Sequence, residues 1–312
     1  FLGTESGLYV SLDGADSWAK WTHGFPTVPT SDLLVHPREH DLIIGTFGRA
    51  IWILDDIRPL REVAKIGLEE LQAKTIHTFE IPHATNAIIG PYWGYRSTGN
   101  GLFMGENKPF SAAISFYAKE KGDVRMQVAD ASGEIVRTRT YKAEAGVNRV
   151  YWGFEADGVR QPGSRKPNSD DAPKPSGYDV LPGTYQITLS MGEESSSGSI
   201  DVLRDMRKDW DANAVEEKQA FIAEYYALVG TVTDAMDKIT EANQIATRIE
   251  SLNVNNDELG EKVKSIKGAL KEMTEQFSEP RIQGLFRNPN LISSVLGNVR
   301  GKMGNSYKPV TQ

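Results

Sequence analysis

The first sixty residues consist of short apolar runs separated by polar turns. The runs at 7–10, 32–35, 42–46 and 50–54 are rich in Leu, Val, Ile and aromatic side chains, and Pro, Gly, Asp and His stand between them. Such runs predict short antiparallel strands joined by tight turns. Their spacing is typical of a β-propeller, in which each blade takes roughly 40 to 50 residues.

The middle of the chain predicts a second β-rich region. Alternating strands are expected at 112–117, 124–128, 135–137, 146–152 and 182–189. Together they predict a small antiparallel β-sandwich over 108–203, with a polar loop at 157–178 that is rich in Pro, Gly, Ser and Lys. Residues 61–107 are expected to form a connector that holds one short helix at 68–74.

The hydrophobic period changes to that of a helix after Asp209. Apolar side chains recur at steps of three and four in two stretches: Ile222, Tyr225, Val229, Val232, Met236 and Ile239, then Leu259, Val263, Ile266, Leu270, Met273 and Phe277. We expect an antiparallel helical hairpin within 204–312, with a third, weaker helix from Leu291 to about Met303. Asn213 is the expected cap of the first long helix, and Asn255 or Asn256 that of the second.

Composition narrows the functional classes. The chain has 312 residues, a formal charge of −7, 39% apolar residues and no cysteine. The acidic balance argues against a nucleic-acid partner, and no apolar run is long enough to span a bilayer. Without cysteine there can be no disulfide, thiolate metal site or cysteine nucleophile. The five histidines show no metal-binding spacing, so neither a metal nor another cofactor is expected.

The turn between the first two strong strands has a specific pattern. Ser11, Asp13, Gly14, Ser17 and Trp18 follow an apolar strand within eight residues. Asp13 is expected to accept hydrogen bonds from backbone N–H groups two or three residues on, and Gly14 tolerates positive φ. Ser17 can add a side-chain bond, and Trp18 is expected to bury its ring beneath the hairpin.

This turn resembles the Asp-box, or BNR repeat (S-x-D-x-G-x-[ST]-W), of sialidase-like and sortilin-like β-propellers. The family's glycine falls on Ala15 in this chain. The segment from Asp41 to Asp56 resembles the last blade of large bacterial BNR-repeat proteins that are often labelled glycosyl hydrolases. The later patterns G-x-N-x-V-x-W at 146–152 and P-G-T-Y-x-I-x-L at 182–189 resemble the immunoglobulin-like domain that follows that propeller.

The resemblance implies a multidomain β + α chain. Residues 1–60 would form terminal propeller blade(s), 61–107 a connector, 108–203 an Ig-like sandwich and 204–312 a helical hairpin or three-helix region. It also implies a secreted, periplasmic or cell-surface bacterial protein. Because sixty residues hold little more than one blade, we expect the remaining blades of the same protein to cover the first sheets.

Candidate ligand-binding residues are few. Arg49 lies between Gly48 and Ala50, which leave its side chain uncrowded, although a salt bridge to Asp55 or Asp56 is an equal alternative. Tyr92, Trp93 and Tyr95 could stack on a sugar or pack between domains. Asp55 and Asp56 are adjacent on a strand end and point to opposite faces, so they do not form a glycosidase pair, and no catalytic residue is assigned.

Three functions fit this sequence. The first is a non-catalytic C-terminal portion of an exported BNR-repeat protein, which closes the propeller and docks on a protein, such as another cell-envelope protein, through its helices. The second is part of a sialidase-like glycoside hydrolase whose catalytic residues lie in other blades. The third is a carbohydrate-binding module that uses its aromatic loop to hold a glycan.

Overall fold

The computed structural model describes residues 1–312 except 89–107, 170–171, 253–255, 279–287 and 304–312. The described residues form two compact units. The first contains the described residues of 1–86, 108–154 and 181–203, and the second contains those of 87–88, 155–180 and 204–303. The chain is therefore a multidomain protein of mixed β-sheets and helices, as its sequence predicts. The finer division into four segments stays a prediction.

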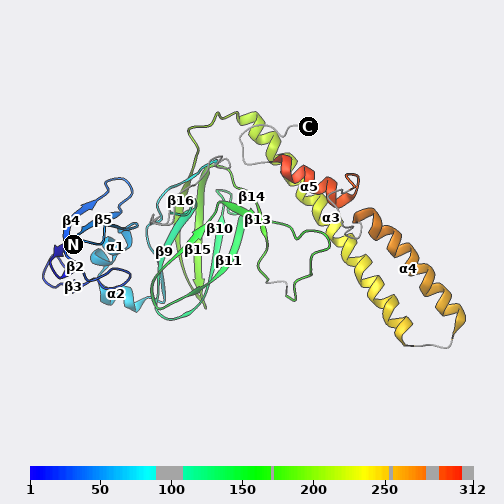
Figure 1. The fold of residues 1–312 in the computed structure, drawn as a ribbon, viewed down its shortest axis with the longest axis horizontal. Helices are drawn as coiled ribbons and strands as arrows, with labels where there is room; N and C mark the ends of the chain where they lie inside the picture. The colour runs from blue at the N-terminus through cyan, green and yellow to red at the C-terminus, as the bar shows by residue number, and fades with distance from the viewer. Residues whose placement is uncertain (89–107, 170–171, 253–255, 279–287, 304–312) are drawn as a thin grey trace. The chain divides into compact units, whose positions relative to one another are not determined.

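The first unit begins with two small antiparallel sheets (Figure 1). One has the order β1 (Leu2–Thr4), β2 (Gly7–Val10) and β3 (Ala19–Lys20), and the other β4 (Thr30–Val35), β5 (Leu42–Thr46) and β6 (Ile51–Leu54). They share a core built on Leu8, Phe25, Leu42, Ile44 and Ile57. The sheets come close at Gly3, where a Cβ would lie 2.7 Å from the Thr30 carbonyl oxygen.

Two short helices follow these sheets. They are α1 (Arg58–Ile66), which sequence reasoning missed, and α2 (Leu68–Ala73), which it predicted. Pro59 suits the first turn of α1, where a missing N–H costs no helical hydrogen bond. Gly67, at φ +90°, separates the two helices, and Val63 and Leu71 bury their side chains with Phe79.

Two larger sheets complete the first unit. One has the order β11 (Ile135–Ala143), β10 (Gly122–Ala129), β15 (Gly183–Met191), β16 (Glu194–Arg204) and β8 (Ala84–Asn86), and the other β12 (Gly146–Trp152), β9 (Ala112–Ala118) and β7 (Ile76–Thr78). Trp152 and Tyr185 join them, with ring centroids 5.3 Å apart. Ile114 and Phe116 from one sheet and Met126 and Ile187 from the other are fully buried, so the predicted strands enclose a common core.

The second unit contains a two-stranded ribbon and helices. The ribbon pairs β13 (Glu155–Asp157) with β14 (Ser176–Asp179), so the two ends of the predicted loop at 157–178 lie in strands. The described residues between the two strands belong to no helix or strand. The helices are α3 (Ala212–Ser251), α4 (Asp257–Phe277) and α5 (Ile292–Met303). Asn256 caps α4 as predicted, with its Oδ1 3.0 Å from the Leu259 N–H.

The cap of α3 differs from the prediction. Asp211 occupies this position and accepts hydrogen bonds from the backbone N–H groups of Asn213 and Ala214. A carboxylate is a strong acceptor and also interacts favourably with the helix dipole, so Asp211 starts the helix two residues before Asn213.

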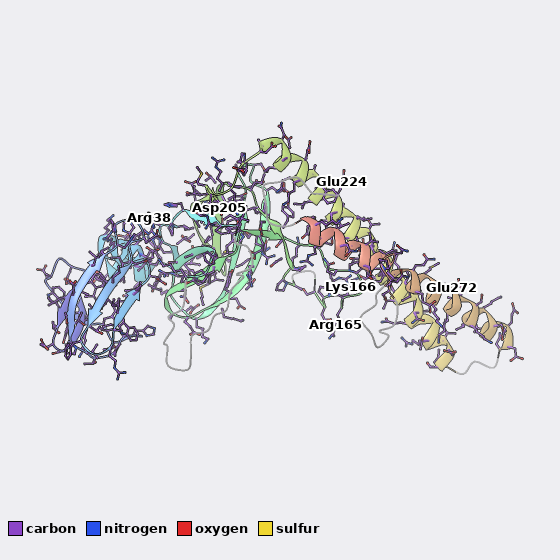
Figure 2. The ribbon with its side chains drawn as sticks, turned by 45° about the horizontal axis from the view of Figure 1, so that its top comes forward. Arg38, Arg165, Lys166, Asp205, Glu224 and Glu272 are labelled. Carbon is purple, nitrogen blue, oxygen red and sulfur yellow. The ribbon has the colours of Figure 1, made fainter. Side chains whose placement is uncertain are left out.

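Helix α3 is the scaffold of the second unit. Ile222, Tyr225 and Val229 pack on Leu296 of α5, and the Tyr225 hydroxyl donates to the Leu296 carbonyl over 3.2 Å. Gly297 and Gly301 lower the helix propensity of α5, and this packing against α3 stabilises it as a helix. Exposed acids such as Glu224 on α3 and Glu272 on α4 mark the polar faces of the helices (Figure 2).

Candidate docking surface

The sheet β4–β5–β6 has one covered face and one open face. Leu33, Ile44 and Trp52 lie opposite one another across the three strands, and so do Val35, Leu42 and Leu54. Directly opposed residues of antiparallel strands point to the same face of the sheet. All six belong to the core that this sheet shares with β1–β2–β3, so another small sheet covers this face.

The opposite face is also apolar, but it is open to solvent. Leu34, Ile43 and Ile53 form a row across the strands, and Ile51 lies one row further along. Leu34 is 59% exposed, Ile53 60% and Ile51 70%. Contiguous exposed apolar side chains of this kind mark interaction sites on soluble proteins. We call Leu34, Ile43, Ile51 and Ile53, together with Phe47, the open face.

Phe47 and Arg49 extend this surface at the β5–β6 turn. Phe47 is 78% exposed, and Arg49 is also exposed. Gly48 and Ala50 both have positive φ, +85° and +58°, and the Thr46 hydroxyl donates to the Ala50 carbonyl. The Trp52 indole N–H donates to the Arg49 carbonyl over 3.0 Å, which holds the turn in place.

Arg49 does not form the salt bridge that was the alternative to a binding role. Asp56 instead pairs with Arg58 at 2.7 Å, and Asp55 lies 3.7 Å from the Lys108 ammonium. The structure therefore leaves Arg49 exposed in the β5–β6 turn. Its predicted role in ligand binding stays a prediction.

The end of β6 is fixed by contacts from distant parts of the first unit. The Arg149 guanidinium donates to the carbonyls of Asp55 and Asp56 over 3.0 and 3.2 Å, and to the Ser115 hydroxyl. Asp56 has φ +51°, a left-handed conformation that non-glycine residues rarely adopt. Sequence reasoning missed Arg149, because nothing local to residue 149 indicates a partner more than ninety positions away.

The carboxylate of Asp41, just before β5, also has fixed partners. The Lys108 ammonium lies 2.6 and 2.7 Å from the two carboxylate oxygens of Asp41, and Asp41 accepts from the Asp56 N–H. Charge-assisted bonds of this length are among the stronger polar contacts in proteins. These contacts and those of Arg149 link the end of β6 to other parts of the first unit, and so they stabilise the sheet that carries the open face.

The predicted Asp-box residues form a closed hydrogen-bonded turn. Asp13 accepts from the Ser17 N–H over 3.0 Å and from the hydroxyls of Ser11 and Ser17. The Ser11 hydroxyl accepts from the Ala15 N–H over 2.8 Å. Gly14 has φ +76°, as expected, and Ala15 has φ +82° at the position where the motif places glycine.

Trp18 corrects the prediction of a buried ring. Its side chain is 42% exposed. Trp18 lies just before β3, which has only two residues and stands at the edge of its sheet, so little of the sheet covers the ring. The ring therefore lines a cavity at the side of the hairpin instead of filling the core beneath it.

The second unit also leaves part of a predicted apolar seam uncovered. Val263 and Phe277 of α4 are buried, but Ile266 and Met273 are each 52% exposed. The two exposed residues are seven positions apart and so lie on the same side of the helix. The sequence pattern identified these residues, but packing against α3 and α5 covers only part of the stripe.

Several predictions concern sites that the described residues do not contain. Tyr92, Trp93 and Tyr95 lie outside the described residues, so the aromatic loop stays a prediction. Over the described ranges, no group of three or more His, Asp or Glu side chains is placed to hold a metal ion. None of the helices in those ranges is long and apolar enough to cross a membrane.

Comparison with known proteins gives only slight likenesses. No protein-family model matches the chain. No curated protein matches it. Among solved structures, dimeric latent PorU from Porphyromonas gingivalis is similar over 30% of this chain and 8% of PorU, with 10% identity and a TM-score of 0.21.

Two further structures are similar over a larger part of the chain. The BSP domain of a biofilm-associated protein covers 61% of this chain and 22% of its own, with 10% identity and a TM-score of 0.21. PorZ, a bacterial surface component of the type-IX secretion system of Porphyromonas gingivalis, covers 64% and 20%, with 12% identity and a TM-score of 0.20. The chain spans less than a quarter of each of these three proteins, and TM-scores this low support no inference about fold or function.

Proposed function

We propose that this chain is a non-catalytic docking module whose β4–β5–β6 sheet packs against a further β-sheet, as a blade does in a β-propeller of the BNR-repeat type. The observation that carries the proposal is the open face, because it is apolar on a sheet whose other face is already covered by a sheet. A propeller blade is sandwiched in this way between two neighbours.

The nature of the occupant follows from the shape and chemistry of the surface. The row Leu34, Ile43 and Ile53 is flat, because it runs across three hydrogen-bonded strands. Sheets pack face to face through such rows about 10 Å apart. Within the described residues β6 pairs with β5 only, so its outer edge is also free to receive a strand. An antiparallel sheet with an apolar face satisfies both features.

Site-specific photo-crosslinking in the native host tests this proposal. A benzoylphenylalanine residue replaces Ile53, and the crosslinked peptides are identified by mass spectrometry. We expect adducts with strand segments that alternate apolar and polar residues, in the same polypeptide or another. Ile135 of β11 is the matched control, because it is also an isoleucine on a strand and is 50% exposed.

The outcome distinguishes specific packing from general stickiness. Equal adducts from positions 53 and 135, or adducts with lipid or glycan at position 53, would contradict the proposal. A sheet partner reached only from position 53 would support it, and the sequence of the crosslinked peptide would show whether it carries Asp-box turns.

The helices provide a second part of the docking function. Ile266 and Met273 present an exposed apolar stripe on α4, and amphipathic helices bury such stripes against a partner. The same crosslinker at Ile266 should give protein adducts, whereas Ser265, which is exposed on a different side of the helix, should not. Equal yields at the two positions would contradict a role for the stripe.

A further inference from the structure

A cavity of about 670 Å³ lies between the β2–β3 hairpin and helices α1 and α2. Pockets that hold small molecules in proteins span roughly 300 to 1,000 Å³. Its apolar lining comes from both sides of the gap: Val10, Leu12 and Trp18 from the hairpin, and Val63, Ile66 and Leu68 from the helices. The cavity is distinct from the open face, since none of the open-face residues lines it.

The cavity is open to solvent and not a packing defect in the core. Trp18 is 42% exposed and Leu68 is 52% exposed, so a large ring and an aliphatic side chain meet water at its walls. The backbone around them is held in place, because the Asp13 turn fixes one side and the buried side chains of Val63 and Leu71 anchor the other. A rigid apolar cleft with an exposed aromatic ring is a preformed binding surface.

The charges that line the cavity are all negative. Asp13, Glu69 and Glu70 belong to the lining, and no Lys or Arg of the described chain does. Hydrogen bonds from the Ser17 hydroxyl and N–H and from Ser11 lower the pKa of Asp13 to about 2, so it is ionised at any physiological pH. Lys74 lies 3.9 Å from Glu70 at the surface and offsets part of that charge, so Asp13 and Glu69 contribute most of the negative field of the cleft.

We propose that this cavity binds a small organic cation with an apolar body, such as an aromatic or alkyl amine. The apolar body would lie between Trp18 and Leu68, and the ammonium group would face the carboxylates of Asp13, Glu69 and Glu70. A cation near the face of an indole ring is also stabilised by the ring quadrupole. The proposal does not depend on the docking function, and either can fail alone.

Three probes of similar size separate the contribution of charge from that of apolar contact. They are 2-phenylethylammonium, 2-phenylethanol and phenylacetate, each titrated into the full chain by isothermal titration calorimetry at pH 7. We expect the cation to bind about tenfold more tightly than the neutral alcohol, and the anion not to bind measurably. Raising the salt concentration should lower the affinity for the cation and leave the affinity for the alcohol unchanged, because salt screens only the interactions of the charged ligand.

Variants assign the binding to this cavity. Trp18→Ala should abolish binding of both the cation and the alcohol. Phe47→Ala removes a more exposed ring that lies outside the cavity, so it should not change the affinity for either probe. Leu68→Lys keeps the hairpin intact and places a positive charge in the cleft, so it should abolish cation binding even if Trp18→Ala perturbs folding. The double variant Glu69→Gln and Glu70→Gln should remove the preference for the cation.

Each contrary result overturns the proposal. These results are equal binding of the cation and the alcohol, cation binding that survives Leu68→Lys, and equal losses in the Trp18 and Phe47 variants. Tighter binding of a lysine-containing apolar peptide than of the amine would also overturn it, because the cleft would then be a peptide site. Circular dichroism of each variant verifies that the chain is folded.

Discussion

Two isoleucines on neighbouring strands test whether the β4–β5–β6 sheet has one covered and one open face. Ile44 on β5 is 3% exposed, and Ile53 on β6 is 60% exposed. Replacing either by alanine removes three carbons, and complete burial of three methylene-sized groups is worth about 2.4 kcal/mol. With the cavity left behind, Ile44→Ala should destabilise the sheet by about 3 kcal/mol.

The same change on the open face should cost much less. Ile53 has only about two-fifths of its surface buried, so Ile53→Ala should lower the stability of the sheet by only about 1 kcal/mol. It should also leave no closed cavity. The two substitutions are chemically identical and lie in paired strands, so strand propensity and denatured-state effects largely cancel between them. The expected difference of about 2 kcal/mol measures the coverage of the two faces.

The measurement must report on this sheet alone, because a chain with several units need not unfold in one step. Hydrogen exchange of peptides covering 42–54, followed against denaturant, gives the local opening free energy. Equal losses for the two variants would refute the two-faced description of the sheet. If the loss for Ile53→Ala grew with protein concentration, a second copy of the chain would be covering the open face.

The remaining predictions concern single contacts. Ala15→Gly should stabilise the hairpin by about 0.5 to 1 kcal/mol, since φ +82° strains alanine and not glycine, and a lower melting temperature would contradict this. Arg149→Met removes three hydrogen bonds, so it should lower the free energy of local opening at 55–58, measured by hydrogen exchange, by about 2 kcal/mol. Arg149→Lys should restore only part of this loss. Burial and then the charge of Glu155 raise the pKa of Asp179, against the opposing effect of Lys218. The folded chain therefore favours the protonated form of Asp179, and the stability that this contributes is complete at low pH and lost as the pH rises through the raised pKa. Exchange protection of the β13–β14 ribbon should fall along the same rise in pH, and Asp179→Asn should flatten the profile.

Local features of the fold followed from sequence because their causes are local. The Asp13 turn depends on side chains within eight residues, and Ser17 supplies the predicted hydroxyl donor. The backbone N–H donor is that of Ser17, four residues on instead of the predicted two or three, and the hydroxyl of Ser11 is a further donor. Asn256 caps α4 for the same reason. Helix α1 was missed because it lies directly after a strand, and the buried Pro59 at its start is equally typical of a loop.

Candidate-site residues divide in the same way. The sequence identified Arg49 and Trp18 as candidates. It did not show that Asp55 and Asp56 have other cationic partners, or that Trp18 lines an open cavity. Each of these facts depends on residues that are distant in the chain. Arg149 and Lys108 carry no local signal of their contacts with the end of β6.

The sequence by itself determined which side chains share a face, because strand and helix periods are properties of the backbone. It placed Ile51 and Ile53 on one side of a strand, and Ile266 and Met273 on one side of a helix. Only the tertiary structure decided which of these faces is covered. Coverage requires a partner element at the right distance, and the packing of β1–β2–β3, α3 and α5 supplies it for one side and not for the other.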